Sequence, residues 1–162
     1  MTAADILRVA TVSDAQISPD GSWVVYTVTT PEGNGTRSTL WLVRMAADTS
    51  ETALEAARPA ARRSTPVQLL PSGWNASTPR WSPDSRRIAF LASEKDETVM
   101  YVVSIDNRSP RRVATVAETN FFITYAGEQL AWSPDGKRLA YISATDDEAA
   151  QDERAESKDP RV

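Results

Sequence analysis

One short phrase recurs three times along the chain, and it constrains the fold more than any other feature. Ser-Pro-Asp-Gly begins at Ser18 and again at Ser133, and Ser-Pro-Asp-Ser begins at Ser82. An apolar run follows each copy at the same offset. These runs are residues 24–26, 88–90 and 139–141. Because whole strand-turn-strand units recur at long spacing, the chain is predicted to be a repeat protein.

Each part of the phrase suits a tight turn between two strands. Proline presets φ at the first corner, aspartate bonds its neighbouring backbone, and glycine accepts the left-handed conformation. Ser85 takes the glycine position in the second copy, where a β-carbon at positive φ costs on the order of 1 kcal/mol, so we expect another turn type there. We interpret the repeated aspartates as structural rather than catalytic or calcium-binding. The turn residues are Ser18, Pro19, Asp20, Gly21, Ser82, Pro83, Asp84, Ser133, Pro134, Asp135 and Gly136.

The strand pattern divides the chain into two full units and the start of a third. Residues 14–72 and 76–118 each hold four short strands, and residues 127–144 hold two more. Trp81 and Trp132, directly before the phrase, are interpreted as packing residues between adjacent sheets. The predicted fold is all-β, with about two and a half four-stranded antiparallel blades of a β-propeller.

Three segments are predicted to lie outside the blades. Residues 1–13 have apolar residues at helical spacing and are expected to form a short helical lead-in. Residues 46–66 read as a surface insertion. Residues 145–162 contain seven acidic and three basic residues, which account for the whole net charge of −4. We interpret that run as a flexible, solvated segment rather than a calcium or partner site, because it lacks the spacing of a calcium loop.

An aromatic stretch between the second and third units is the best candidate for an interface. Phe121, Phe122 and Tyr125 lie in a connection of the kind that lines a propeller mouth or contacts a neighbouring domain. The alternative is that this composition forms an ordinary strand and packs within the fold.

The composition excludes several kinds of chemistry. The chain has no histidine and no cysteine, so it contains no Ser-His-Asp triad, Cys-His dyad or histidine-ligated zinc site. We assign no catalytic residue, cofactor or metal ligand. The charges before residue 145 balance, which argues against nucleic acid as a partner. No apolar run has membrane-spanning length and no secretory start is recognisable, so we expect no membrane association and a cytoplasmic location.

The order of short motifs at the start of the chain resembles a known family. The motifs are Asp5-Ile6-Leu7-Arg8, then Thr11-Val12-Ser13-Asp14, then the first turn phrase. This order looks like the opening of the propeller in the prolyl oligopeptidase family, especially its acylaminoacyl-peptidase and dipeptidyl-peptidase-like branch. The end of the acidic run, Asp159-Pro160-Arg161-Val162, resembles the hydrophilic crossing within the third blade. The resemblance implies a propeller of seven blades in all and then an α/β-hydrolase domain with a Gly-x-Ser-x-Gly elbow. This sequence has no such elbow, so the resemblance implies the N-terminal part of a serine peptidase, cut short.

The resemblance also implies a function and partners. The propeller of such enzymes covers the active site and admits short or acylated peptides, so the expected partners are the rest of the propeller, the hydrolase domain and peptide substrates. Since repeat units bury their faces against neighbours, we expect marginal stability or self-association through the open blades. The alternatives are a protein-binding propeller of the Tol-Pal type and an inactive truncated product.

Overall fold

The computed structural model of the chain describes residues 9–45, 64–117 and 129–143. These residues form ten strands, and within the described parts there is no helix. The strands are β1 (Thr11–Ile17), β2 (Trp23–Glu32), β3 (Gly35–Arg44), β4 (Val67–Gln68), β5 (Ala76–Trp81), β6 (Arg87–Glu94), β7 (Glu97–Ser104), β8 (Arg111–Val116), β9 (Leu130–Trp132) and β10 (Leu139–Tyr141).

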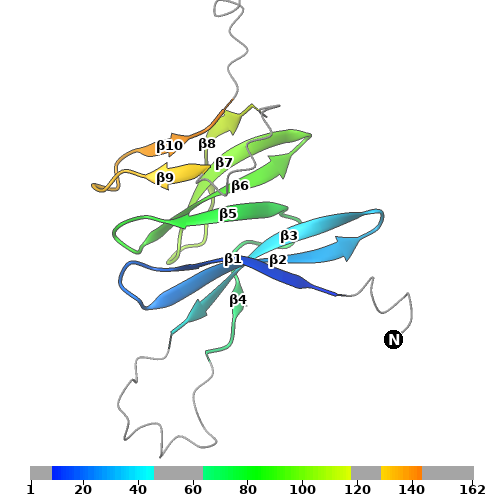
Figure 1. The fold of residues 1–162 in the computed structure, drawn as a ribbon, viewed down its shortest axis with the longest axis horizontal. Helices are drawn as coiled ribbons and strands as arrows, with labels where there is room; N and C mark the ends of the chain where they lie inside the picture. Colours follow the sequence, from blue (N-terminus) through cyan, green and yellow to red (C-terminus); the bar gives the residue numbers. More distant parts are fainter. Residues whose placement is uncertain (1–8, 46–63, 118–128, 144–162) are drawn as a thin grey trace, which may run out of the picture.

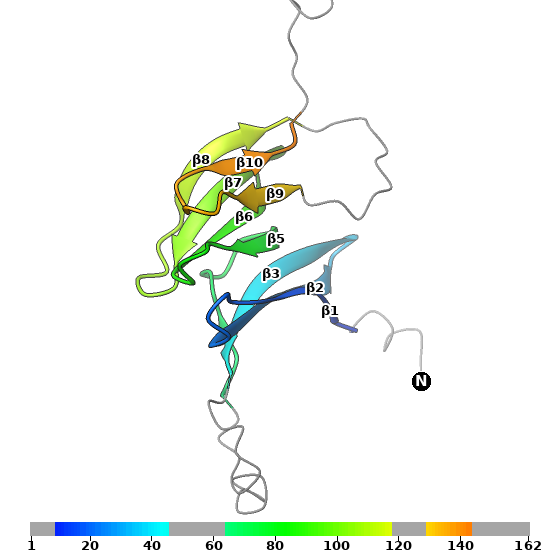
Figure 2. The same ribbon diagram turned by 60° about the vertical axis from the view of Figure 1, so that its left-hand side comes forward.

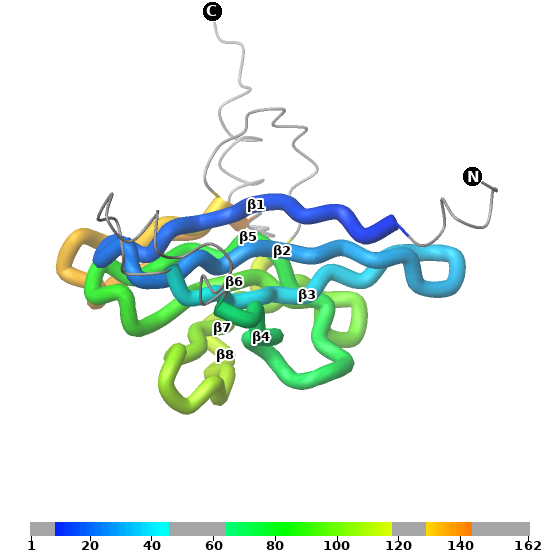
Figure 3. Tube along the Cα trace, turned by 90° about the horizontal axis from the view of Figure 1, so that it is seen from below, coloured from blue at the N-terminus to red at the C-terminus, as the bar shows by residue number. Residues whose placement is uncertain are grey.

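The strands form three antiparallel sheets, and within each sheet neighbouring strands follow one another along the chain. The first blade is β1-β2-β3-β4, the second is β5-β6-β7-β8, and β9 pairs with β10 in the third. The second blade lies between the other two (Figure 1), and β5 stays between β1 and β9 in the turned view (Figure 2). Figure 3 shows the first strands β1 and β5 toward one side and the last strands β4 and β8 toward the other. The predicted all-β fold of antiparallel four-stranded blades is confirmed.

The second blade is apolar on both faces because it is covered on both. Ile88 and Phe90 of β6 point toward the first blade and join a buried cluster that includes Leu40. Ala89 and Met100 point the other way and pack with Leu130 of the third blade. This explains why β6 and β7 read as nearly continuous apolar runs rather than as an apolar-polar alternation.

The first blade has an apolar face that belongs to neither buried cluster. In the strand register Val12 pairs with Val28, Ile17 with Val24, and Tyr26 with Trp41, so these side chains share one face, opposite the buried Val25 and Leu40. Val12 and Ile17 are 62% and 64% exposed. The equivalent face of the second blade carries the buried Ile88 and Phe90. We call this surface the outer face of the first blade, defined by Val12, Ile17, Val24, Tyr26, Val28, Trp41 and Val43.

The predicted helical lead-in does not extend to residue 13. Thr11, Val12 and Ser13 pair with residues 27–29 of β2, because two β-branched residues at the start of this segment suit an extended strand. Residues 1–8, most of the predicted insertion at 46–66, the aromatic stretch with Phe121, Phe122 and Tyr125, and the acidic run at 145–162 lie outside the described residues.

Candidate functional site

The three Ser-Pro-Asp turns fold in the same way. In the second, Ser82 Oγ donates to Asp84 Oδ1 over 2.5 Å and accepts from the backbone N–H of Arg87 over 3.0 Å. Asp84 Oδ1 also accepts from the backbone N–H of Arg86, at 3.1 Å, and the Ser85 N–H donates to the Ser82 carbonyl, at 2.9 Å. The Ser-to-Asp bonds of the first and third turns are both 2.6 Å. Each turn is therefore a closed hydrogen-bonded loop.

The same bonds set the ionisation of the aspartates. The serine hydroxyl, followed by other contacts of the turn, holds the pKa of Asp20, Asp84 and Asp135 below the ordinary aspartate value. A carboxylate stabilised in its charged form is a poor proton donor near neutral pH. Among the described residues there is also no group of acidic side chains placed to hold a metal ion.

Ser85 keeps the turn type that its neighbours have, so the expectation of another turn type is wrong. Its φ is 59°, beside 70° at Gly21 and 66° at Gly136. The serine gains a contact that glycine lacks, because its Oγ accepts the backbone N–H of Asp20 in the first turn over 3.0 Å. That bond between turns offsets the strain at positive φ.

The tryptophans before the turns join successive blades. Trp81 Nε1 donates to the Gln16 carbonyl, and Trp132 Nε1 donates to the Arg80 carbonyl, both over 3.0 Å. Both acceptors lie two positions before the turn serine of the preceding blade, so the contact is repeated. In the first blade the tryptophan position is Ile17, whose side chain has no N–H to donate.

Arginine adds a second link at this end of the blades. The Arg87 guanidinium lies 4.8 Å from the ring centre of Trp132, and its Nη2 donates to the Gly136 carbonyl over 3.0 Å. The same nitrogen contacts Asp84 Oδ2 at 3.2 Å. The second and third turns are thereby held together.

The first strands of the first two blades share a bulge and a salt bridge. Asp14 and Thr78 both lie four positions before a turn serine, both have positive φ (47° and 55°), and the strand register shifts at both. Arg80 Nη1 lies 2.9 Å from both carboxylate oxygens of Asp14. This pair joins β1 to β5 on the side of the sheets where the first strands meet.

Two hollows lie along these strands. The first-strand hollow has a volume of about 470 Å³ and is walled by residues at repeated positions of all three blades. Its lining residues are Gln16, Ile17, Pro19, Arg80, Trp81, Pro83, Leu130, Ala131 and Trp132. It is mainly aromatic, proline and aliphatic in character.

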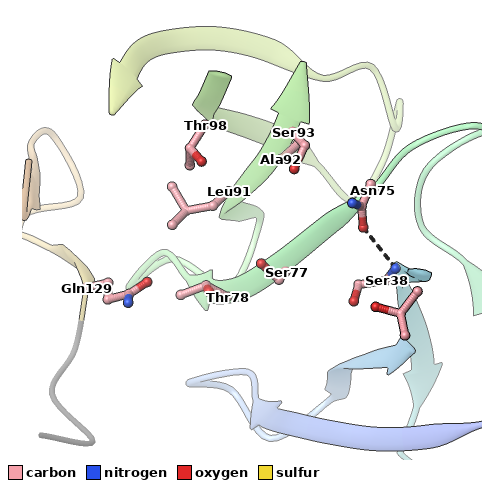
Figure 4. A pocket seen from close by; sticks show the side chains of 10 residues that line it. Ser38, Asn75, Ser77, Thr78, Leu91, Ala92, Ser93, Thr98 and Gln129 are labelled. Carbon is pink, nitrogen blue, oxygen red and sulfur yellow. Dashed lines mark hydrogen bonds between the residues drawn. The ribbon is translucent and has the colours of Figure 1, made fainter. Parts of the chain in front are cut away.

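The second hollow, which we call the polar hollow, has a volume of about 340 Å³ and also involves all three blades (Figure 4). Its lining residues are Thr36, Ser38, Asn75, Ser77, Thr78, Leu91, Ala92, Ser93, Thr98 and Gln129. Asn75 Oδ1 accepts the Ser38 N–H over 2.9 Å and joins the first two blades at its wall. No pattern in the sequence predicts this site, because its hydroxyl residues are spread from Thr36 to Thr98 and form no local motif.

The predicted site residues are distributed as follows. The turn residues lie at one end of the blades, in the bonded loops described above. Phe121, Phe122 and Tyr125 lie outside the residues that the structure describes, so their interface role stays a prediction. In the parts of the chain that are described, no helix is long and apolar enough to cross a membrane.

Comparison with known proteins gives relatives that are peptidases. The uncharacterized peptidase YuxL of Bacillus subtilis is 28% identical over 163 residues, which cover 98% of this chain and 21% of the relative. Dipeptidyl-peptidase 5 of Aspergillus fumigatus is 30% identical over 135 residues, which cover 78% of this chain and 17% of the relative. The chain thus spans about a fifth of the length of these relatives. No protein-family model matches it.

Solved structures with the same fold include propellers of peptidases. The β-propeller domain of the Trilobed protease from Pyrococcus furiosus aligns with a TM-score of 0.57 and 18% identity, over 84% of this chain and 35% of the other. An acylaminoacyl peptidase in complex with Z-Gly-Gly-Phe-chloromethyl ketone aligns with a TM-score of 0.54 and 21% identity, over 83% of this chain and 18% of the other.

The stacked antiparallel blades are therefore those of a β-propeller. The resemblance found in the sequence is also confirmed: the chain is similar to the propeller part of prolyl oligopeptidase-family and acylaminoacyl peptidases.

Proposed function

We propose that this chain is a non-catalytic propeller segment of a prolyl-oligopeptidase-family serine peptidase. In this proposal it filters short or acylated peptides for a hydrolase domain that lies outside these 162 residues. The observation that carries the proposal is the agreement of two comparisons, since the sequence relatives are peptidases and the fold is that of peptidase propellers. The partners under this proposal are further blades, an α/β-hydrolase domain and peptide substrates.

The chemistry of the chain supports a role without catalysis. The sequence has no histidine and no Gly-x-Ser-x-Gly, so a serine nucleophile has neither its elbow nor its usual base. The aspartates of the described turns are held by donors of their own loops. We assign the bond-breaking step to another domain.

The first-strand hollow supports a filter. Repeated aromatic and proline side chains line it, so each added blade would extend the same wall. A passage bounded by rigid, interlocked blades admits an extended peptide more readily than a folded domain, because the walls would have to separate to pass a larger object.

Two experiments test the proposal. The first is to read the encoding locus beyond Val162, where we expect further blades, a Gly-x-Ser-x-Gly elbow and a later histidine. Blades without an elbow would overturn the proposal in favour of a binding propeller, and immediate unrelated sequence would favour an inactive product.

The second experiment is hydrolysis of acyl-peptide and aminoacyl chromogenic substrates. The 162-residue chain alone is expected to give no turnover above buffer. A longer protein that contains it is expected to lose kcat/KM as the substrate lengthens from short peptides to a folded protein. Turnover by the short chain, or equal cleavage of folded proteins, would contradict the assignment.

A further inference from the structure

The polar hollow has the chemistry of a ligand site that the filtering proposal does not use. We propose that it binds an uncharged, extended peptide segment through hydrogen bonds to main-chain groups. The inference concerns binding by this chain alone and is separate from the peptidase assignment, so either can fail without the other.

The lining restricts the class of ligand. Eight of its ten residues carry a hydroxyl or a carboxamide, two are aliphatic, and none is charged or aromatic. Phosphates and carboxylates lack a cationic partner there, and amines and metal ions lack a carboxylate. A sugar ring lacks an aromatic face on which to stack. Hydroxyls and carboxamides both donate and accept, which matches the alternating N–H and C=O groups of a peptide main chain.

Three hydroxyls of the hollow are available for such bonds, whereas the Ser38 hydroxyl is already paired with that of Thr29 over 2.8 Å. Within the described residues, the side chains of Ser77, Thr78 and Thr98 form no hydrogen bond, whereas the serines of the turns are all bonded. Ser77 and Thr78 come from β5, and Thr98 comes from β7 across Leu91 of β6 (Figure 4). A ligand in the hollow would therefore meet donors and acceptors on more than one strand.

The backbone at the wall of the hollow is also interrupted. Strand pairing between β5 and β6 stops at Ser77 and resumes at Arg80. Thr78, at φ 55°, lies in this gap and lines the hollow. Non-glycine residues at positive φ persist where surrounding structure holds them, and they gather at ligand sites. The bulge leaves main-chain groups of β5 outside the ladder, where an added peptide can meet them.

The test is a titration of the isotope-labelled 162-residue chain with acetyl-Ala-Ser-Ala-N-methylamide, followed by backbone amide shifts. We expect saturable shifts centred on Ser77, Thr98 and Gln129, with Kd on the order of 1 mM, the range for a few neutral hydrogen bonds. Thr98→Val and Ser77→Ala are each expected to weaken binding about fivefold, the ratio for one lost neutral hydrogen bond.

Thr30→Val is the matched control, because Thr30 is an exposed strand threonine outside the hollow, and it should leave Kd unchanged. The amide spectrum of each variant without peptide shows whether its fold is intact. Absence of saturable shifts overturns the proposal. So do shifts centred elsewhere, an equal loss in Thr30→Val, or preferential binding of glucose or inorganic phosphate at the same residues.

Discussion

The Asp20 backbone N–H donates to Ser85 Oγ over 3.0 Å, although 65 positions separate the two residues. The bond joins the first turn to the second at the point where the second turn departs from glycine. The residue that breaks the repeated phrase thus makes a contact that the phrase itself does not supply.

Substitutions at Ser85 separate backbone strain from this bond. Ser85→Ala keeps positive φ and loses the acceptor, so unfolding free energy should fall by about 1 kcal/mol. Ser85→Gly loses the same bond but relieves about 1 kcal/mol of strain, so its stability should lie close to that of the parent. Urea unfolding of both variants measures the difference. An alanine variant as stable as the parent would show that the bond contributes nothing, and one as stable as the glycine variant would show that positive φ costs nothing at this position.

Loss of the indole donors should loosen the contacts between blades. Trp81→Phe and Trp132→Phe each remove one hydrogen bond to the preceding blade, and each should lower unfolding free energy by about 1 kcal/mol or more. Trp23→Phe is the control, since the Trp23 indole makes no hydrogen bond to another blade in the described residues. Thermal unfolding ranks the three. Equal losses at all three positions would assign the effect to ring size alone.

A buried hydroxyl in the first blade should cost stability. Thr27 is 3% exposed, and its Oγ1 has no hydrogen-bond partner within the described structure. Thr27→Val keeps the shape and removes the unpaired group, so the variant should be more stable by about 1 kcal/mol. Denaturant unfolding tests the sign, with Thr30→Val, on the exposed part of the same strand, as comparison. A destabilised Thr27→Val would mean that the hydroxyl has a partner in solution.

The turn aspartates predict a loss of stability in acid. Because the folded pKa of Asp84 is below the unfolded one, its contribution is complete above about pH 4 and is lost as pH falls through the folded pKa. Ser82→Ala removes the largest cause of the shift, so the Asp84 pKa should rise toward the ordinary value and the loss of stability below pH 4 should shrink.

Carboxyl carbon NMR follows the Asp84 titration directly, and unfolding at pH 6 and pH 3 gives the stability difference. Ser109→Ala, at an exposed serine outside the turns, should leave both unchanged. An Asp84 pKa that does not move in Ser82→Ala would contradict the assigned cause.

The outer face of the first blade predicts self-association. Val12→Lys with Ile17→Lys places two charges on it at mostly exposed positions, so association should weaken while unfolding free energy changes by only about 0.5 kcal/mol. Sedimentation equilibrium across protein concentrations measures the mass. Val113→Lys, at an exposed valine of β8, is the control. A parent chain that stays monomeric and melts cooperatively would oppose the prediction.

The sequence predicted the antiparallel all-β fold well because the strands follow from local signals. The phrase at Ser18, Ser82 and Ser133 comes directly before each second strand, and runs of β-branched, aromatic and other apolar residues mark the strands themselves. The turn at Ser85 was misjudged because its partner is Asp20, in another blade. The lead-in was misjudged at Thr11 because strand pairing with β2 outweighs helical spacing.

The polar hollow was also hard to predict from the sequence, because it too depends on contacts between residues far apart in the chain. Ser77 and Thr98 are ordinary strand residues in the sequence, and only the stacking of blades brings them to one hollow. The bulge at Thr78 depends on the register of β5 against β6, which no local pattern specifies.

The tryptophan bonds have a direction, and this bears on how the chain is made. Each indole belongs to the later blade, and each acceptor belongs to the earlier one. As a ribosome releases the chain, every new unit therefore emerges carrying the donor for a carbonyl that is already in place. The blades can thus assemble in the order of synthesis, because each folded blade already presents the carbonyl to which the tryptophan of the next blade donates.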